Sequence, residues 1–71
     1  MEYDNTIEKE FLEKLIVNNL AFAKKNAADF KRKAQEAPFN TMDYINARAL
    51  REYYDGQAYA YETILNNIRM D

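Results

Sequence analysis

The chain has 71 residues, enough for one small domain whose interior supplies only about 3–5 kcal/mol of stability. It has no cysteine and no histidine, which excludes disulfides and leaves a structural zinc or iron site without its usual ligands. The net charge is −2 and 48% of the residues are hydrophobic, so the chain is not a disordered tail. We therefore expect oligomerisation to supply additional stability.

A first helix is predicted from about residue 5 to residue 36. Neither proline nor glycine occurs in this range, and most of its residues favour helix. Asn5 is the expected N-cap, because Glu8 lies three residues further on and can reach back to it, as in a capping box.

A break is predicted at residues 37–40. Pro38 lacks a backbone N–H and disfavours helical geometry in the residue before it, so the first helix should end there. Asn40 is then the expected N-cap of the next helix. Phe39 and Tyr44 lie on either side of this cap at the spacing of a hydrophobic staple, which supports the same boundary.

The second helix is predicted from about residue 41 to residue 69. Gly56 is its weakest point, because glycine costs about 1 kcal/mol relative to alanine inside a helix. The apolar pattern passes through Gly56 without a shift, which favours one continuous helix, and a close approach of the backbone to Phe22 would explain the glycine. The alternative is a kink at Gly56, which would produce a three-helix bundle.

Both predicted helices carry apolar or small residues at alternating spacings of three and four, the repeat of a left-handed helical pair. If the chain folds back at Pro38, residues whose numbers sum to about 77 lie side by side. Ala27 then meets Leu50, and Phe30 meets Ala47. The predicted fold is therefore all-α, an antiparallel hairpin of two long helices in one domain. The predicted seam consists of Ile16, Leu20, Ala23, Ala27, Phe30 and Ala34 with Ala47, Leu50, Tyr54, Gln57, Tyr61, Ile64 and Ile68.

Several large apolar side chains remain outside this seam, Leu65 among them. Rows of exposed apolar side chains usually mark an interface. We expect two copies of the hairpin to cover them by pairing into a four-helix bundle, and a different protein partner is the alternative. The candidate interface residues are Ile7, Phe11, Leu15, Phe22, Ile45, Tyr53 and Tyr59.

Charge is distributed unevenly along the chain. Residues 1–23 contain five acidic and two basic residues, a net charge of −3, whereas residues 24–36 contain five basic and two acidic residues, a net charge of +3. Two antiparallel hairpins would place the basic tip of each against the acidic end of the other. The alternative function is binding of nucleic-acid phosphates through Lys24, Lys25, Lys31, Arg32, Lys33, Arg48 and Arg51.

We expect no catalytic activity and no cofactor. The chain lacks serine, cysteine and histidine, and therefore the common nucleophiles and the commonest general base. Its single glycine excludes a glycine-rich phosphate loop. Glu10, Glu13 and Glu62 are candidates for a carboxylate pair, but at helical spacing among lysines such residues more often form surface ion pairs.

Two features bear on location. The longest uncharged stretch, Leu15–Ala23, is too short to span a bilayer, and the acidic residues near the N-terminus are unlike those of a signal or transit peptide. These features predict a cytoplasmic protein.

The segment YYDGQAYAYETILNNI near the C-terminus resembles the ends of many small helical proteins carried by phages and prophages of low-GC Gram-positive bacteria. In those proteins an aromatic-glycine-alanine-tyrosine segment leads into a helix rich in leucine and isoleucine. The resemblance implies an accessory protein that acts by binding, for example by modulating a host or phage protein. The expected function is that of a non-enzymatic protein–protein interaction module.

Overall fold

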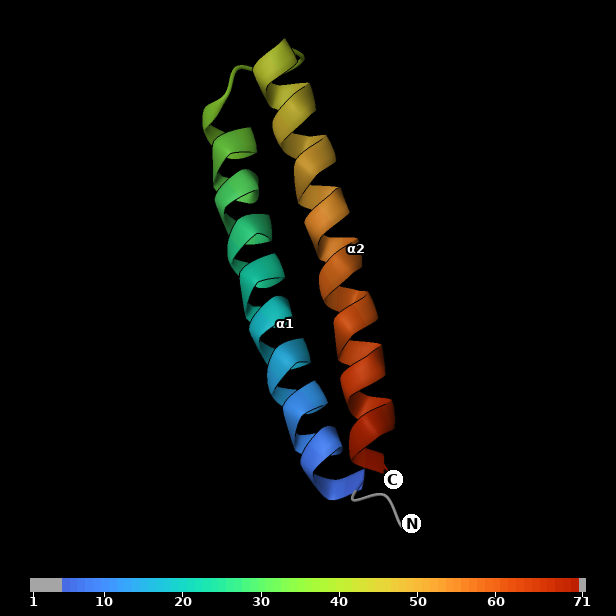
Figure 1. Ribbon diagram of the computed structural model, residues 1–71. Coiled ribbons are helices and arrows are strands. Elements are labelled where there is room, and N and C mark those ends of the chain that lie inside the picture. Colours follow the sequence, from blue (N-terminus) through green and yellow to red (C-terminus); the bar gives the residue numbers. More distant parts are fainter. Residues whose placement is uncertain (1–4, 71) are drawn as a thin grey trace.

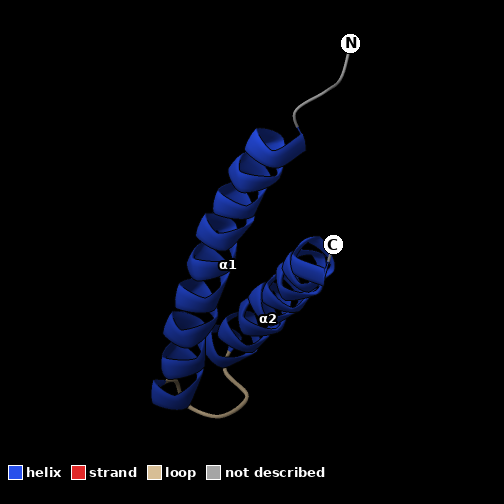
Figure 2. Cartoon of the chain, turned by 90° about the horizontal axis from the view of Figure 1, so that it is seen from below, coloured by secondary structure: helices blue, strands red, loops and turns tan. Residues whose placement is uncertain are grey.

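The computed structural model describes the backbone of residues 5–70 and the side chains of residues 8–70. Over this range the chain forms two helices, α1 (Asn5–Glu36) and α2 (Met42–Met70), and no strand. The helices run antiparallel and pack against each other in a rod of 60 × 16 × 15 Å (Figure 1). A single loop joins them at one end (Figure 2), and the start of α1 lies beside the end of α2 at the other (Figure 1). The predicted all-α hairpin is confirmed.

The break between the helices is a short turn around Pro38. α1 ends at Glu36, and the Ala37 N–H still donates to the Lys33 carbonyl at 3.0 Å. The Thr41 N–H then donates to the Pro38 carbonyl at 3.2 Å and closes a four-residue turn. Its third residue, Asn40, has a φ of 63°, in the left-handed region that asparagine tolerates better than most residues.

The prediction that Asn40 caps α2 is wrong, because Thr41 is the cap. The Thr41 hydroxyl accepts a hydrogen bond from the Tyr44 N–H at 3.2 Å and donates to the Pro38 carbonyl at 2.7 Å. An N-cap residue takes an extended backbone conformation, whereas Asn40 supplies the positive φ of the turn. The expected contact between Phe39 and Tyr44 is present, with ring centroids 5.3 Å apart. The expected cap at Asn5 depends on side chains outside the described residues.

Thr41→Ala should destabilise the protein by about 0.5–2 kcal/mol, because it removes the acceptor for an N–H at the start of α2. Thr41→Ser keeps the hydroxyl and should retain most of that stability. Urea unfolding followed by circular dichroism measures both. If Asn40 were the cap after all, Thr41 would lie inside the helix and its change to alanine would be neutral or stabilising.

Gly56 lies within a continuous helix. α2 runs through it without interruption, and its φ is not positive, so the three-helix alternative is wrong. The expected close approach to Phe22 is also wrong, because a Cβ built on Gly56 would meet no atom within 4 Å. Gly56 is therefore an exposed helical glycine with no packing role in the hairpin.

Gly56→Ala should accordingly stabilise the protein by up to about 1 kcal/mol, since alanine restricts the unfolded chain and favours helix. Ala49, exposed on the same helix, provides the reciprocal control, and Ala49→Gly should cost a similar amount. Thermal unfolding of the two variants beside the parent protein would measure both effects. Loss of stability in Gly56→Ala would mean that another molecule packs closely against this position.

The predicted seam is confirmed in α1 and only half confirmed in α2. Ala23 and Ala27 are buried in α1, as Ala47 is in α2. Leu50 and Ile64, however, are 40% and 45% exposed. Ala58 and Leu65, with 8% and 5% exposure, are buried more deeply than the predicted Gln57, which is half-buried, and the predicted Ile64. The seam of α2 therefore comprises Tyr44, Ala47, Arg51, Tyr54, Ala58, Tyr61, Leu65 and Ile68, all buried or half-buried.

Both versions of the α2 seam keep the alternating spacing of three and four, and they differ by one residue at every second position. Hydrophobicity alone favoured Leu50 over Arg51, and it did not distinguish Ile64 from Leu65. The packing instead places the small Ala58 against α1, where a short side chain lets two helices approach closely.

The predicted register between the helices also needs correction. Glu13 pairs with Arg69, and Lys24 with Glu62. The ring of Phe30 stacks on Tyr54 at 5.8 Å. Each of these partners lies further along α2 than a register summing to 77 would place it, whereas the contact between Phe22 and Tyr54 fits that register.

The interior of the hairpin is small. Among residues 8–70, five hydrophobic residues are buried, and four of them are alanines. Leu65 is the one large apolar side chain in this group. Since stabilisation by burial grows with the apolar area removed from water, this interior contributes little by comparison with a typical domain.

Candidate interaction surface

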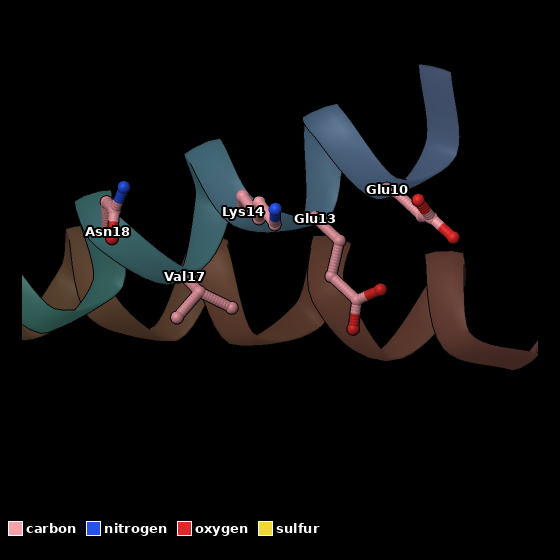
Figure 3. Close-up of a pocket in the computed structure, with 5 residues that line it drawn as sticks. All are labelled: Glu10, Glu13, Lys14, Val17 and Asn18. Atoms are coloured by element: carbon pink, nitrogen blue, oxygen red, sulfur yellow. The ribbon is translucent and has the colours of Figure 1, made fainter. Parts of the chain in front are cut away.

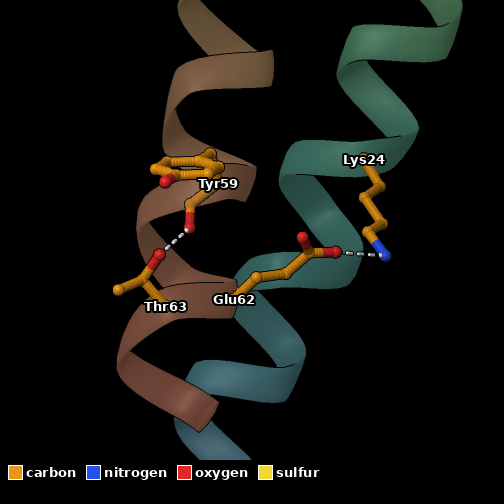
Figure 4. Close-up of polar contacts among 4 residues, drawn as sticks. All are labelled: Lys24, Tyr59, Glu62 and Thr63. Atoms are coloured by element: carbon orange, nitrogen blue, oxygen red, sulfur yellow. Dashed lines mark hydrogen bonds and ion pairs between the residues drawn. The ribbon is translucent and has the colours of Figure 1, made fainter. Parts of the chain in front are cut away.

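The seam divides the surface of the hairpin into two flanks. In an antiparallel helical pair, residues that immediately follow a seam residue lie on one flank, and residues that immediately precede one lie on the other. Lys24 follows Ala23 and Glu62 follows Tyr61, and their side chains meet across the helices at 2.8 Å (Figure 4). That ion pair identifies the first flank, which we call the charged flank.

The charged flank holds the ion pairs of α2 and a shallow hollow beside α1. The Arg48 and Glu52 side chains pair at 3.5 Å along it. The hollow lies near the open end of the hairpin, and the residues that line it are Glu10, Glu13, Lys14, Val17 and Asn18 (Figure 3). All five belong to one helix, and the carboxylate of Glu13 is held by Arg69 at 2.7 Å.

The second flank is uncharged and apolar over most of its length. Residues that precede a seam residue on both helices form it, so two segments distant in sequence contribute to one surface. Six of them are large apolar side chains that are 40% to 62% exposed. We call this surface the apolar face, defined by Leu12, Leu15 and Phe22 of α1 with Leu50, Tyr53 and Ile64 of α2.

Ring contacts hold the aromatic residues of the apolar face in place. Tyr54, in the seam, contacts Phe22 edge-on with ring centroids 6.4 Å apart, and it contacts Tyr53 edge-on at 5.2 Å. Its other neighbour is Phe30, stacked at 5.8 Å. Tyr54 is partly buried and contacts all three of these rings. Its contacts hold the rings of Phe22 and Tyr53 in place, so both rings present fixed apolar surfaces to solvent.

Polar residues between the large side chains of the apolar face are amides. The Asn26 amide donates to the Phe22 carbonyl at 2.8 Å, and the Gln57 amide donates to the Tyr53 hydroxyl at 2.8 Å. Asn19 is exposed, and its side chain makes no hydrogen bond within the described part of the chain.

The predicted interface residues do not all belong to this face. Leu15, Phe22 and Tyr53 lie on it together. Phe11 lies at its outer edge, one position further from the seam. Ile45 and Tyr59 each follow a seam residue and are exposed on the charged flank instead, and the Ile7 side chain lies outside the described residues.

The predicted interface omits three residues of the apolar face, Leu12, Leu50 and Ile64. Leu50 and Ile64 were predicted to lie in the seam, and Leu12 was not among the predicted interface residues. The signal that could have identified all three is position. Leu50 and Ile64 immediately precede seam residues once the seam of α2 is shifted by one residue at every second position, and Leu12 immediately precedes the half-buried Glu13, which continues the α1 seam three residues before Ile16.

The residues predicted to bind nucleic acid are mostly engaged within the protein. Lys24 pairs with Glu62, Arg32 with Asp29, Arg48 with Glu52 and Arg51 with Asp55. The Lys33 ammonium lies over the Phe30 ring, 4.9 Å from its centroid. Lys25 and Lys31 make no ion pair with any described residue. Acidic side chains therefore accompany most of the basic ones at the tip.

Of the three glutamates considered for a carboxylate pair, Glu10 and Glu13 line the same hollow, whereas Glu62 lies on α2. Glu13 and Glu62 each bind a basic residue of the other helix, and Glu10 lines the hollow beside α1. Within the described residues no three acidic side chains gather as metal ligands. Over the same residues neither helix has an apolar stretch that could cross a bilayer.

The structure therefore defines a class of protein, an antiparallel helical hairpin with one charged and one apolar flank. No protein-family model matches the chain, and neither a curated protein nor a solved structure matches it.

Proposed function

We propose that this protein is a non-enzymatic helical interaction module that works as a homodimer, with two hairpins packing their apolar faces together into a four-helix bundle. The observation that carries the proposal is the gathering of six large, exposed apolar side chains on one flank, while the ion pairs between the helices lie on the other. Monomeric soluble proteins rarely expose large contiguous apolar patches, and patches of this kind usually mark protein interfaces.

The small interior of the hairpin supports the same proposal. Four of the five buried hydrophobic residues are alanines, and the chain has neither a disulfide nor the usual ligands of structural zinc. Burial of a leucine or phenylalanine side chain stabilises a protein by about 1.5–3 kcal/mol. Covering the apolar face of each copy would thus add stability of the same order as the interior supplies.

Sedimentation equilibrium combined with thermal unfolding tests the proposal. We expect the mass of a dimer at tens of micromolar, and a melting temperature that rises with protein concentration because association is linked to folding by mass action. A compact monomer whose melting temperature does not depend on concentration would reject the homodimer.

The second candidate, binding of nucleic acid through the basic tip, has less support. The ion pairs of Lys24, Arg48 and Arg51 offset much of the local positive charge. Retention on random DNA in low salt, lost steeply as salt is raised, would favour this candidate, because phosphate contacts release counterions. We expect no such retention.

The role of a phage or prophage accessory protein belongs to this proposal as well. It rests on the resemblance of residues 53–68 to the ends of such proteins. The segment spans the α2 part of the apolar face from Tyr53 to Ile64, so a binding role is compatible with it.

A further inference from the structure

The α1 part of the apolar face is nearly symmetric about Asn19. Leu15 and Phe22 lie four residues before and three residues after it, and Leu12 and Asn26 lie seven residues away on either side. In a closed two-fold dimer the same surface serves both subunits, so that residue i contacts residue j and j contacts i. Two antiparallel α1 helices centred on Asn19 would set Leu15 of each copy beside Phe22 of the other.

Asn19 itself favours a dimer centred on this residue over one in which the two α1 helices are shifted along each other. Its carboxamide carries both donors and acceptors, so two copies of the group can bond to each other. Asn26 and Gln57 already use an amide hydrogen within the hairpin, whereas Asn19 makes no hydrogen bond with any described residue. An amide buried without a partner is costly, and for that reason a single asparagine can fix the register of paired helices.

The charges of α1 also favour an antiparallel arrangement of the two α1 helices. Residues 8–23 carry three acidic and two basic residues, a net charge of −1, and residues 24–36 carry a net charge of +3. Antiparallel α1 helices place these unlike halves together. Parallel hairpins would instead place the two basic tips side by side, where like charges repel.

We infer that the occupant of the apolar face is a second copy lying antiparallel to the first, with α1 against α1 and the two-fold axis beside Asn19. This inference rests on the proposed homodimer and adds its geometry. The axis lies near the middle of the rod, so the apolar faces of both copies overlap. The opposite orientation, with parallel hairpins, would set α1 of one copy against α2 of the other.

Distances between spin labels test the orientation directly, because the chain has no cysteine of its own. Gln35→Cys puts a label at the tip, on the flank opposite the apolar face. Gln35 lies 16 residues from Asn19, so antiparallel copies separate the two labels by about 48 Å along the rod. Parallel copies would bring them within about 30 Å, because neighbouring helices lie about 8–10 Å apart.

Asn18→Cys is the matched control, because it lies beside the proposed axis and should give a short distance in either orientation. A short distance at Asn18 with a long one at Gln35 supports the antiparallel dimer. Short distances at both positions overturn the orientation and leave the proposed dimer intact. A monomeric mass with no dipolar signal at either position overturns the proposed function itself.

Asn19→Leu tests the part assigned to the asparagine. The variant should still dimerise. A second population with a short distance between the two labels at position 35 should appear, because the orientation of the copies is no longer specified. If the Asn19→Leu dimer keeps a single long distance, charge and side-chain spacing set the orientation without the amide pair, and that step of the inference is wrong.

Discussion

Changing Leu15 and Phe22 together to glutamate should convert the protein to a monomer and lower its melting temperature steeply. Both side chains lie on the apolar face, 46% and 62% exposed in the single hairpin. In a two-fold dimer each change is present twice, so four apolar side chains are lost, each worth about 1.5–3 kcal/mol when buried. Carboxylates in the same places would also bring like charges together across the interface.

The chain offers a matched control for this double variant. Ile45 and Tyr59 are exposed to a similar degree, 49% and 73%, but lie on the charged flank. Ile45→Glu combined with Tyr59→Glu should leave the dimer and its concentration-dependent melting unchanged. Sedimentation equilibrium and thermal unfolding over a range of concentrations measure both pairs. A dimer that survives the first pair and is lost in the second would place the interface on the charged flank.

The second large effect is expected at Leu65, where a change to alanine should cost about 2–5 kcal/mol. Leu65 is 5% exposed and is the one large side chain among the buried hydrophobic residues described. No other buried side chain can fill the space that its removal would leave, since the remaining four are alanines. A loss of this size is comparable with the whole stability expected of so small an interior, so the variant should be largely unfolded at 37 °C.

Urea unfolding of Leu65→Ala, Ile64→Ala and Tyr59→Ala tests this assignment of the seam. Tyr59→Ala should change the free energy of unfolding by less than about 0.5 kcal/mol, as is usual for exposed sites. Ile64→Ala should cost less than Leu65→Ala, and its cost should depend on protein concentration because Ile64 lies on the apolar face. If Ile64→Ala were the more damaging change, the seam originally predicted for α2 would be correct.

Local features of the sequence determined the two helices and the place of the break. Pro38 ends α1 whatever the tertiary packing, because it cannot donate a backbone hydrogen bond. The alternating apolar pattern through Gly56 was sufficient to predict a continuous α2. The α1 seam could also be predicted, since its apolar and small residues alternate at spacings of four and three from Ile16 to Ala34.

The tertiary structure decided what depends on neighbours in space. Thr41 and Asn40 are adjacent residues that both favour N-caps, and only the closed turn, with its positive φ at Asn40, assigns the cap to Thr41. In α2, hydrophobicity alone could not choose between Ile64 and Leu65. Packing made the choice, because the small Ala58, about two turns closer to the break, brings α1 close on the side where Leu65 also points.

The same one-residue choice decided the candidate surface. A sequence analysis that places Leu50 and Ile64 in the seam removes them from the surface, and it then groups Ile45 and Tyr59 with Phe22 on one interface. Each flank is formed by two helices that run in opposite directions, so its composition depends on which residue of each turn faces the partner helix. The sequence was sufficient to predict a surplus of apolar side chains, but their division between the two flanks follows from the packing of α1 against α2.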